Sequence, residues 1–380
     1  MWPKPCCETG PEPLRVSLHS ADLHYGGGLE LHTASSGSIP HLTEIYLRLD
    51  DGETIGVGEV RANIAYLNGF TVSTVVERAA VALDEVEWTR DPADLIATMP
   101  EWGARLIAPV RALIDCGLHD FAARRERLSV GAWLGAATQE MVWDTNQTLF
   151  WSSFEDFLAQ AQAYVDRGFV DLKVRVAAAD FAEDLRRIAA LRARFGTEIK
   201  IAADANGRWS AAEALGKLDA LAAYDLAYVE QPIPPGDWAA VDDLAGRSPV
   251  PVMLDESVAT ADDITRICGY GGRVLAHLKL VKLGGIAPTV AAARRLAASG
   301  VPFMIGQMNE GGAATAAALH VACATSPAFA ELYGADGLID DPVSGVSYMA
   351  GTVHTDRASG LGVAFDAAAT HLIGDFGHGQ

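Results

Sequence analysis

Basic residues are scarce in this chain: 29 lysines and arginines face 49 aspartates and glutamates, which gives a formal net charge of −20. Nucleic acids and anionic membrane surfaces bind patches of positive charge, so we expect no nucleic acid and no membrane as a partner. An anionic small molecule is not excluded, because a bound cation can reverse the local field. The shortage of positive charge therefore leaves small-molecule chemistry open.

Cysteine is also scarce, and long apolar runs are missing. The odd number and the scatter of the cysteines argue against a disulfide framework and against zinc-type pairing, and predict reduced thiols. No apolar run is long enough to cross a bilayer, and no basic-then-apolar segment opens the sequence, so we expect a cytoplasmic protein. The first two cysteines lie in a proline-rich start that we expect to be a frayed tail. The five are Cys6, Cys7, Cys116, Cys268 and Cys323.

What the chain does contain is enough apolar sequence for a large core. Half of its 380 residues are hydrophobic, which fits one large domain and a smaller one. Residues 14–60 alternate as strands do, with a tight turn at Asp51-Gly52 that predicts a hairpin. Residues 71–128 have helical periodicity. Strands followed by helices predict an N-terminal α+β capping domain over residues 1–135.

From about residue 142, candidate strands alternate with alanine-rich amphipathic helices. Eight strands with seven intervening helices in about 200 residues predict a (β/α)8-type TIM barrel, here assigned to residues 136–350. We expect the C-terminal segment, residues 351–380, to return to the capping domain. The candidate strands are 142–150, 170–175, 199–204, 226–231, 251–255, 275–281, 302–307 and 329–333.

Acidic residues end three successive candidate strands, at a spacing of roughly 25 residues that matches one strand, one helix and two short loops. These residues are Asp204, Glu230 and Asp255. The carboxyl ends of the parallel strands of a barrel meet at one mouth, so the three carboxylates should converge on one point. Oxygen clusters of this kind suit a hard divalent cation, and Mg2+ is the first expectation.

Two lysines flank these carboxylates in strand order, Lys173 on the strand before them and Lys279 on the strand after. The two strands lie on opposite sides of an eight-stranded barrel, so the amines should face each other across the mouth. A lysine can remove the α-proton of a carboxylate substrate if burial beside other cations lowers its pKa. Arg175 shares the face of Lys173 by strand parity and supplies such a cation. These residues predict a metal-dependent enzyme that acts on a small-molecule carboxylate.

An ordered set of short motifs runs through nearly the whole chain: Gly56-Val-Gly-Glu59, Leu118-His-Asp120, Lys173/Arg175, Asp204-Ala-Asn206, Val229-Glu-Gln-Pro232, Asp255-Glu-Ser257, Lys279-Leu-Val-Lys-Leu-Gly-Gly285 and a closing Gly-Leu-Gly. The set resembles the enolase superfamily and, within it, the muconate lactonizing enzyme (muconate cycloisomerase) subgroup. The resemblance implies Mg2+ on Asp204, Glu230 and Asp255, with acid/base catalysis by Lys279 and by the Lys173/Arg175 pair. It also implies capping-domain loops that close over the mouth and select the substrate, and a homo-oligomer.

The chain departs from the family pattern at one position. The family usually has Lys-x-Lys on the second barrel strand. In this chain, Arg175 stands in the place of the second lysine. Arginine is effectively always protonated and is a poor base, so one-sided chemistry from Lys279 is favoured unless Lys173 acts as the second base. The mandelate racemase subgroup is disfavoured because strand 302–307 has no histidine. A dipeptide substrate is not supported, because Ala330–Asp336 lacks the Asp-x-Asp of dipeptide epimerases.

Five further residues are candidates for contacts to the substrate or to the residues named above: Asn206, Glu256, Glu310, Arg61 and Tyr66. Glu256 is interpreted as supporting the ligands rather than as a ligand. Glu310 orients a lysine or the substrate, or else lies on a loop surface. Arg61 and Tyr66 follow the turn where the family has a lid loop, so they contact the distal end of the substrate or lie on the surface. Two other residues are interpreted as lying outside the chemistry: His277 as a hydrogen-bonded core histidine and Lys282 as an outer residue of its strand.

The reaction favoured by these residues is a cycloisomerisation through an enolate. A β-eliminating acid dehydratase and a racemase of amino-acid derivatives are the alternatives within the superfamily. An alternative of another class is a catalytically silent barrel that only binds a ligand. Loss of a metal ligand or of Lys279 would favour the silent barrel, and neither is lost.

Overall fold

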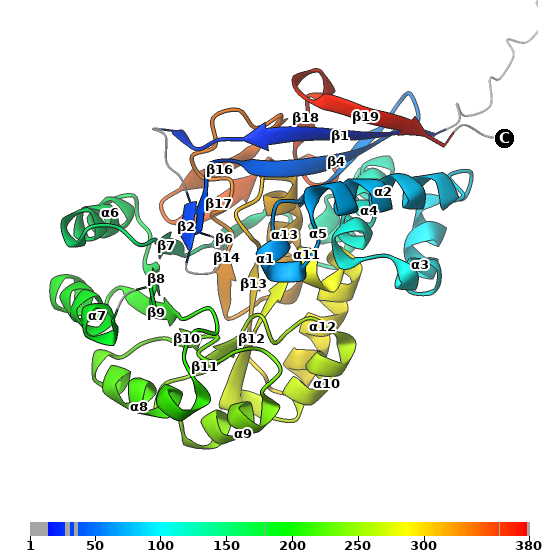
Figure 1. The fold of residues 1–380 in the computed structure, drawn as a ribbon. Coiled ribbons are helices and arrows are strands. Elements are labelled where there is room, and N and C mark those ends of the chain that lie inside the picture. The colour runs from blue at the N-terminus through cyan, green and yellow to red at the C-terminus, as the bar shows by residue number, and fades with distance from the viewer. Residues whose placement is uncertain (1–13, 27–30, 34–36, 179, 357, 378–380) are drawn as a thin grey trace, which may run out of the picture.

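The computed structural model describes residues 14–26, 31–33, 37–178, 180–356 and 358–377. Cys6 and Cys7 lie outside these residues. Figure 1 shows a β/α barrel in the lower part of the view and a smaller α+β layer across the top. Among the described residues, no helix combines the length and the hydrophobicity that crossing a bilayer requires.

The barrel consists of eight parallel strands, each paired with the next in chain order. The Asn146 amide donates to the Ala330 carbonyl at 3.1 Å and links the first strand to the last. The predicted barrel is therefore confirmed. Its strands are β7 (Gln147–Leu149), β8 (Asp171–Arg175), β9 (Lys200–Asp204), β10 (Val229–Glu230), β11 (Val252–Leu254), β12 (Val274–Lys279), β13 (Phe303–Gly306) and β14 (Phe329–Glu331).

The predicted strand 142–150 is in fact two strands. β6 (Val142–Asp144) pairs antiparallel with β17 (Thr352–Thr355), whereas β7 pairs with β8. Between them, the Thr145 amide donates to the Gly351 carbonyl, while the next amide donates to Ala330 on β14. The backbone changes partners over these two residues, and the strand is divided there.

Seven longer helices surround the barrel strands, and side-chain caps define where several of them begin. Ser153, Asp180, Asp237 and Thr260 each accept a hydrogen bond from a backbone N–H of the first turn. Such caps satisfy amides that have no partner within the helix. The helices are α6 (Phe154–Asp166), α7 (Phe181–Phe195), α8 (Ala211–Leu221), α9 (Trp238–Arg247), α10 (Ala261–Cys268), α12 (Ile286–Ala298) and α13 (Gly312–Thr325), with the short α11 (Leu280–Leu283) before α12.

The upper layer in Figure 1 is an antiparallel sheet in the order β19-β1-β4-β5. β19 (His371–Phe376) pairs with β1 (Arg15–Leu23), so the last strand of the chain joins the N-terminal sheet. The domain boundaries near residues 135 and 350 stay a prediction. The remaining elements are β4 (Leu42–Asp50), β5 (Ile55–Arg61), α1 (Ala65–Asn68), α2 (Val72–Glu85), α3 (Pro92–Trp102), α4 (Ala108–Arg125), α5 (Val130–Trp133), β2 (Leu31–Thr33), β3 (Gly37–Ile39), β15 (Val343–Ser344), β16 (Val346–Met349) and β18 (Ala364–Phe365).

Three of the motifs in the sequence hold the capping sheet against α4. A Cβ atom at Gly58 would lie 2.1 Å from the Leu113 carbonyl oxygen, so only glycine lets α4 approach β5 this closely. The Asp120 carboxylate accepts the amides of Val57 at 2.8 Å and of Leu361 at 2.6 Å. The Gly-Val-Gly-Glu motif, which lies within β5 and not in a turn, the Leu-His-Asp segment and the closing Gly-Leu-Gly thus build one packing contact. Their glycines and aspartate have a structural role.

The barrel interior has an apolar layer below a charged one. Alternate residues of a strand point to the same face, so residues two positions before Asp204, Glu230 and Asp255 lie directly below them. These lower residues are Ala202, Tyr228 and Met253, which form a buried cluster with Leu275 and Met304. The side chains of the barrel mouth therefore rest on a packed apolar floor.

Candidate active site

The three carboxylates lie together at the barrel mouth. Asp204 and Glu230 end neighbouring strands and are paired in register, and Asp255 follows the end of β11. All three side chains are buried, with at most 2% of each residue exposed. A buried carboxylate needs a cationic or hydrogen-bonding partner to stay ionised, and the structure provides cationic partners for each.

Lys173 lies completely buried among carboxylates. Its Nζ is 2.9 Å from Glu230 Oε2 and 3.6 Å from Asp204 Oδ2, and it also forms an ion pair with Glu331. Burial lowers the pKa of Lys173, but the carboxylates of Glu230 and Glu331 outweigh burial and raise the pKa well above its usual value. In turn, burial raises the pKa of Glu230, but Lys173 and His277 outweigh it and lower that pKa.

Arg175 holds the next carboxylate along the mouth. Its guanidinium forms an ion pair with Asp204 and donates to Asn206 Oδ1 at 3.0 Å. Burial raises the pKa of Asp204 to about 6 against the lowering effect of Arg175. Asn206 also donates to Glu256 Oε1 at 3.3 Å. Arg175 and Asn206 thus link the end of β9 to the segment that follows β11.

Lys279 ends β12 and donates to Asp255 Oδ2 at 2.7 Å. The sequence predicts a lowered lysine pKa at this position, and this prediction is wrong. Burial does lower the pKa of Lys279, but Asp255 and two further carboxylates outweigh burial and raise the pKa above its usual value. Burial beside cations alone would lower this pKa, but the Asp255 carboxylate contacts Nζ directly and determines the sign.

Lys282 corrects one prediction about position. Strand parity placed its side chain away from the site, yet its Nζ donates to the backbone carbonyl and to Oδ1 of Asp255, both at 2.5 Å. The strand ends at Lys279, and α11 begins with the next residue. Parity does not apply past the strand end, so the helical turn brings Lys282 to the mouth.

Glu331 is a site residue that the sequence reasoning missed. It ends β14 and pairs in register with Gly306, which itself pairs with Lys279. Its carboxylate is buried and contacts Lys173. The signal was present in the sequence, because Glu331 lies on the eighth candidate strand as Asp204 lies on the third.

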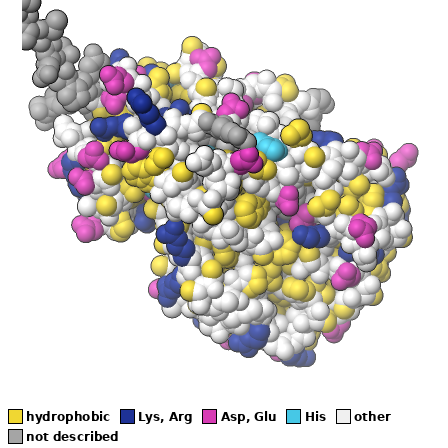
Figure 2. Space-filling view, turned by 180° about the vertical axis from the view of Figure 1, so that it is seen from behind, with side chains coloured by type: hydrophobic (Ala, Val, Ile, Leu, Met, Phe, Trp, Pro, Cys, Tyr) yellow, Lys and Arg dark blue, Asp and Glu magenta, His cyan; other side chains and the backbone are white. Residues whose placement is uncertain are grey.

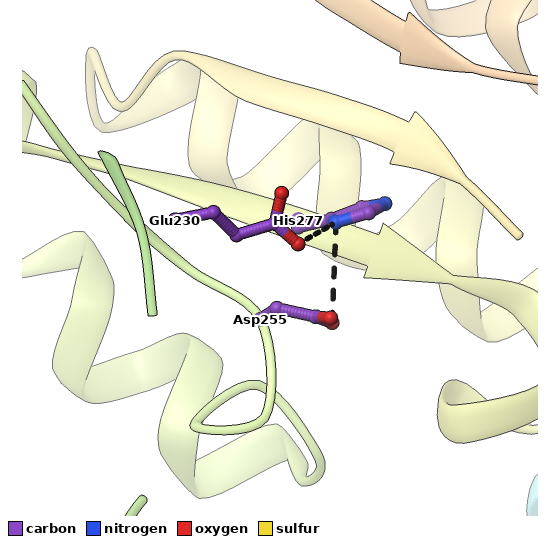
Figure 3. A group of neighbouring side chains, drawn as sticks. All are labelled: Glu230, Asp255 and His277. Atoms are coloured by element: carbon purple, nitrogen blue, oxygen red, sulfur yellow. Dashed lines mark hydrogen bonds and ion pairs between the residues drawn. The ribbon is translucent and has the colours of Figure 1, made fainter. Parts of the chain in front are cut away.

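His277 lies beside two of the carboxylates at the barrel mouth. Figure 3 shows its ring beside Glu230 and Asp255, with Nδ1 2.9 Å from Glu230 Oε1 and 4.0 Å from Asp255 Oδ1. The expected hydrogen bond is confirmed. A Cβ atom at residue 306 would lie 1.9 Å from His277 Nε2, so Gly306 leaves the space that the ring occupies.

The residues at the mouth fit a divalent cation. Glu230, Asp255 and His277 offer ligand atoms that lie within 4.8 Å of one another. Glu256 adds a buried oxygen, Oε2, that accepts no hydrogen bond from the described residues, and burial beside Asp255 and Asp204 raises the pKa of Glu256 to about 7. Oxygen-rich sites of this composition suit hard cations. The donor set of this chain can therefore hold a metal ion.

A small cavity of about 50 Å3 opens at the mouth. Four of the five supporting candidates line this cavity: Arg61, Tyr66, Asn206 and Glu256. Arg175, Asp255, Lys279, Glu331 and Tyr333 line it as well. The fifth candidate, Glu310, is buried and is not part of the lining, and its carboxylate accepts a hydrogen bond from the Met308 amide at 3.0 Å. Arg61 is buried rather than on the surface, and its NH2 nitrogen has no hydrogen-bond partner among the described residues. The loop-surface alternatives for Arg61 and Glu310 are therefore wrong.

Comparison with known proteins agrees with this geometry. The chain is 29% identical over 257 residues to the L-Ala-D/L-Glu epimerase of Bacillus subtilis, which covers 67% of this chain and 70% of that protein. It is 28% identical over 309 residues to muconate cycloisomerase 1 of Rhodococcus opacus, covering 79% and 81%. These relatives are isomerases.

The fold has close solved counterparts. A dipeptide epimerase from Cytophaga hutchinsonii, solved with Mg and the dipeptide D-Ala-L-Val, superposes with a TM-score of 0.86 at 22% identity, covering 95% of this chain and 99% of that one. A family model described as "Enolase C-terminal domain-like" matches residues 156–369, more than half of the sequence. The chain therefore belongs to the enolase superfamily, and the relatives it resembles include muconate cycloisomerases and dipeptide epimerases.

Proposed function

We propose that this chain is a metal-dependent enzyme that removes or adds a proton α to a substrate carboxylate, and that its net reaction is a cycloisomerisation of the muconate cycloisomerase kind. One observation carries the proposal. Lys279 and Arg175 line the same cavity from β12 and β8, and the three strands β9, β10 and β11 separate these two in the sheet. A substrate carbon between them would have a lysine on one face and a permanent cation on the other.

Each residue has a separate task in this proposal. Lys279 is the acid/base catalyst, and its contact with Asp255 holds Nζ at the cavity wall. A cation bound at Asp255 would offset the carboxylate charge that raises the pKa of Lys279. Arg175 cannot accept a proton at neutral pH, so it stabilises negative charge on the substrate. Lys173 is enclosed by Glu230 and Glu331. We infer that it supports the carboxylates electrostatically.

We propose Mg2+ as the metal, held by Asp204, Glu230 and Asp255. When bound, it would stabilise the enolate charge that develops on the substrate carboxylate. Two facts support this choice: the buried oxygen donors of the site, and the Mg in the related dipeptide epimerase structure. Calorimetric titration with Mg2+ tests it, and Asp204→Asn, Glu230→Gln and Asp255→Asn should each weaken binding while the barrel stays folded.

The cavity wall supports a role for Arg61 and Tyr66 at the distal end of the substrate. The guanidinium of Arg61 is buried with one nitrogen unpartnered, a costly state that an acceptor on a substrate would relieve. Asn206, Glu256 and Glu310 would hold the binding residues in place. The substrate that fits is a small organic acid with a second polar group.

The test is exchange of the α-proton with solvent. A set of organic acids is incubated with Mg2+ in D2O, and deuterium incorporation is followed by NMR for each enantiomer separately. We expect wash-in from one face, and Lys279→Ala should reduce it by about 10²–10⁴-fold, the usual contribution of a general base. Circular dichroism of the variant shows whether the fold is kept.

Two results would change the assignment. Equal wash-in from both faces would show that Lys173 is a second base and would favour a racemase. Loss of water from the substrate in the same spectra would favour a dehydratase. Arg175→Lys should open the second face, because lysine can deprotonate where arginine cannot. Unchanged exchange in Lys279→Ala would contradict the proposal itself.

We also propose that the enzyme is a cytoplasmic homo-oligomer. This rests on the superfamily and on the low cysteine content. Light scattering at micromolar concentration measures the assembly, and a monomer would contradict it.

A further inference from the structure

A second and larger cavity lies outside the barrel mouth. It has a volume of about 730 Å3 and runs between α3 and α4 of the capping layer and α10, α11 and α12 of the barrel. Figure 1 shows α3 above α10 and α12 on one side of the molecule, and the outline in Figure 2 is indented between the upper and lower parts. Pockets for small molecules have volumes of about 300–1,000 Å3 and often lie between domains. This cavity, called the groove from here on, therefore has the size of a ligand site.

The groove has an apolar floor and a positive charge balance. Its apolar lining includes Ile96, Met99, Leu106, Ile264, Leu283 and Pro288. The charged side chains of the lining are Arg111, Lys282, Arg295 and Asp115. The ammonium group of Lys282 is paired with Asp255 outside the groove, which leaves two arginines against one carboxylate. In a chain with a net charge of −20, this is an unusual local balance. It favours a ligand that is apolar over most of its length and negatively charged at one end.

Two buried polar atoms in the groove have no partner within the described part of the chain. They are Arg111 Nε and Asp115 Oδ1. Neither Arg111 nor Arg295 forms an ion pair with any described residue. A buried donor without an acceptor costs about 1–3 kcal/mol. An anionic group at Arg111 would satisfy this donor, and a neighbouring O–H or N–H of the same ligand could donate to Asp115.

The groove shares residues with the barrel mouth. Lys282 lines the groove, and its ammonium group holds Asp255. The side chain of Arg111 lies against the end of α11, where a Cβ atom at Gly284 would be 2.8 Å from Arg111 Cδ. α11 begins directly after Lys279. An occupant of the groove would therefore contact the helical turn that follows Lys279.

We propose that this groove is a second binding site, for a small organic anion with an apolar body. The anionic group lies at Arg111, and the apolar body lies along α3, α10 and α12. This assignment does not depend on the reaction catalysed at the mouth.

The test uses octanoate and its uncharged analogue octanamide as probes, with binding to the full-length protein measured by calorimetry. Ala291 is exposed on α12 and lines the groove, so Ala291→Trp fills it without disturbing the core. Ala297 is exposed on the same helix and does not line the groove, and Ala297→Trp is the matched control. We expect octanoate binding to weaken at least about tenfold in Ala291→Trp and to be unchanged in the control.

The charge is tested separately. Arg111→Gln should weaken octanoate by at least about tenfold, the contribution of a hydrogen bond to a charged group, and leave octanamide unchanged. Arg78→Gln, at an exposed position on α2, is the control. Hydrogen exchange should show protection by octanoate in α3 and in residues 280–292, rather than in the strands β8 to β10.

Three results would overturn the proposal. One is no binding at millimolar octanoate. Another is equal binding to the Ala291→Trp variant, which would place the probe at the barrel mouth or elsewhere. The third is a fall in molecular mass on light scattering of Ala291→Trp, which would show that a second copy of the chain covers the groove. None of these depends on proton exchange at the mouth, so they leave the proposed reaction untouched.

Discussion

Two buried groups of carboxylates lie a short distance apart in this protein, and they differ in their cations. At the barrel mouth, Glu230 and Asp255 are held by Lys173, Lys279 and Lys282. At the seam between the capping sheet and the barrel, Arg61 is the cation that acts on Glu44, and Arg61 and Lys279 act on Glu310. This second group, the seam cluster, consists of Glu44, Glu59, Glu310 and Asp341.

The difference in cations decides the protonation state. Burial raises the pKa of every carboxylate at both places, but at the mouth the lysines outweigh burial and lower the pKa of Glu230 and Asp255. In the seam cluster, burial and neighbouring carboxylates raise the pKa of Glu44 and Glu59 well above the usual value. Glu230 and Asp255 are therefore held in the charged form at the mouth, whereas burial at the seam favours the neutral form of Glu44 and Glu59.

The largest loss of stability should come from removing a buried cation at the mouth. Lys173→Met removes the completely buried cation between Glu230 and Glu331. Removing one partner of a buried ion pair costs about 3–5 kcal/mol, so the free energy of unfolding should fall by this amount. Urea unfolding at neutral pH with a metal chelator measures it.

The control for this variant is Arg247→Met. Arg247 forms an exposed pair with Asp243 at 2.9 Å on α9, and a pair of this kind contributes about 0–1 kcal/mol. If Lys173→Met unfolds at the same urea concentration as the unmodified protein, the mouth is not held together by charge balance.

A smaller effect should appear in the pH dependence of stability. Burial raises the pKa of Glu310 to about 7 in the folded protein, against about 4.3 in the unfolded chain. Between these values the folded state binds more protons, so the free energy of unfolding falls as pH rises through this window. Glu310→Gln removes this contribution. Across the window, the free energy of unfolding of the variant should therefore fall by less than that of the unmodified protein, with a difference of more than about 1 kcal/mol.

Urea unfolding at several pH values from the acid to the neutral range gives this comparison. Glu53→Gln, at an exposed position in the turn between β4 and β5, is the matched control and should follow the unmodified protein. Parallel curves for Glu310→Gln and the unmodified protein would show that Glu310 is ionised when buried.

The smallest effect is expected at Glu44. Both of its oxygens are buried, and neither has a hydrogen-bond partner among the described residues. Glutamine has nearly the shape of the neutral acid, so Glu44→Gln should change the free energy of unfolding by less than about 1 kcal/mol at mildly acidic pH. The same change at Glu230, which removes one of the carboxylates that hold the buried Lys173, should destabilise more. Equal effects at the two positions would remove the distinction between mouth and seam.

Much of the fold followed from regular spacing. The eight strands, the positions of Asp204, Glu230 and Asp255 at strand ends and the hairpin at Asp51-Gly52 were predictable, because each rests on local periodicity or turn chemistry. The burial of Arg61 and Glu310 was not predictable, because it depends on two segments far apart in the sequence. The Arg61 guanidinium donates to the Asn309 carbonyl at 3.1 Å, across the seam.

The sequence by itself determined the order of strands, the family and the set of charged side chains at strand ends. These depend on patterns along the chain: the two-residue period of a strand, the 3.6-residue period of a helix and the length of one strand plus one helix. Tertiary structure alone decided which charges meet. The end of β12 at Lys279 turned Lys282 toward Asp255, and closure of the barrel brought Glu331 to Lys173. The physical reason is that a pKa depends on the distance to neighbouring charges and on burial, and both are fixed only when separate segments pack together.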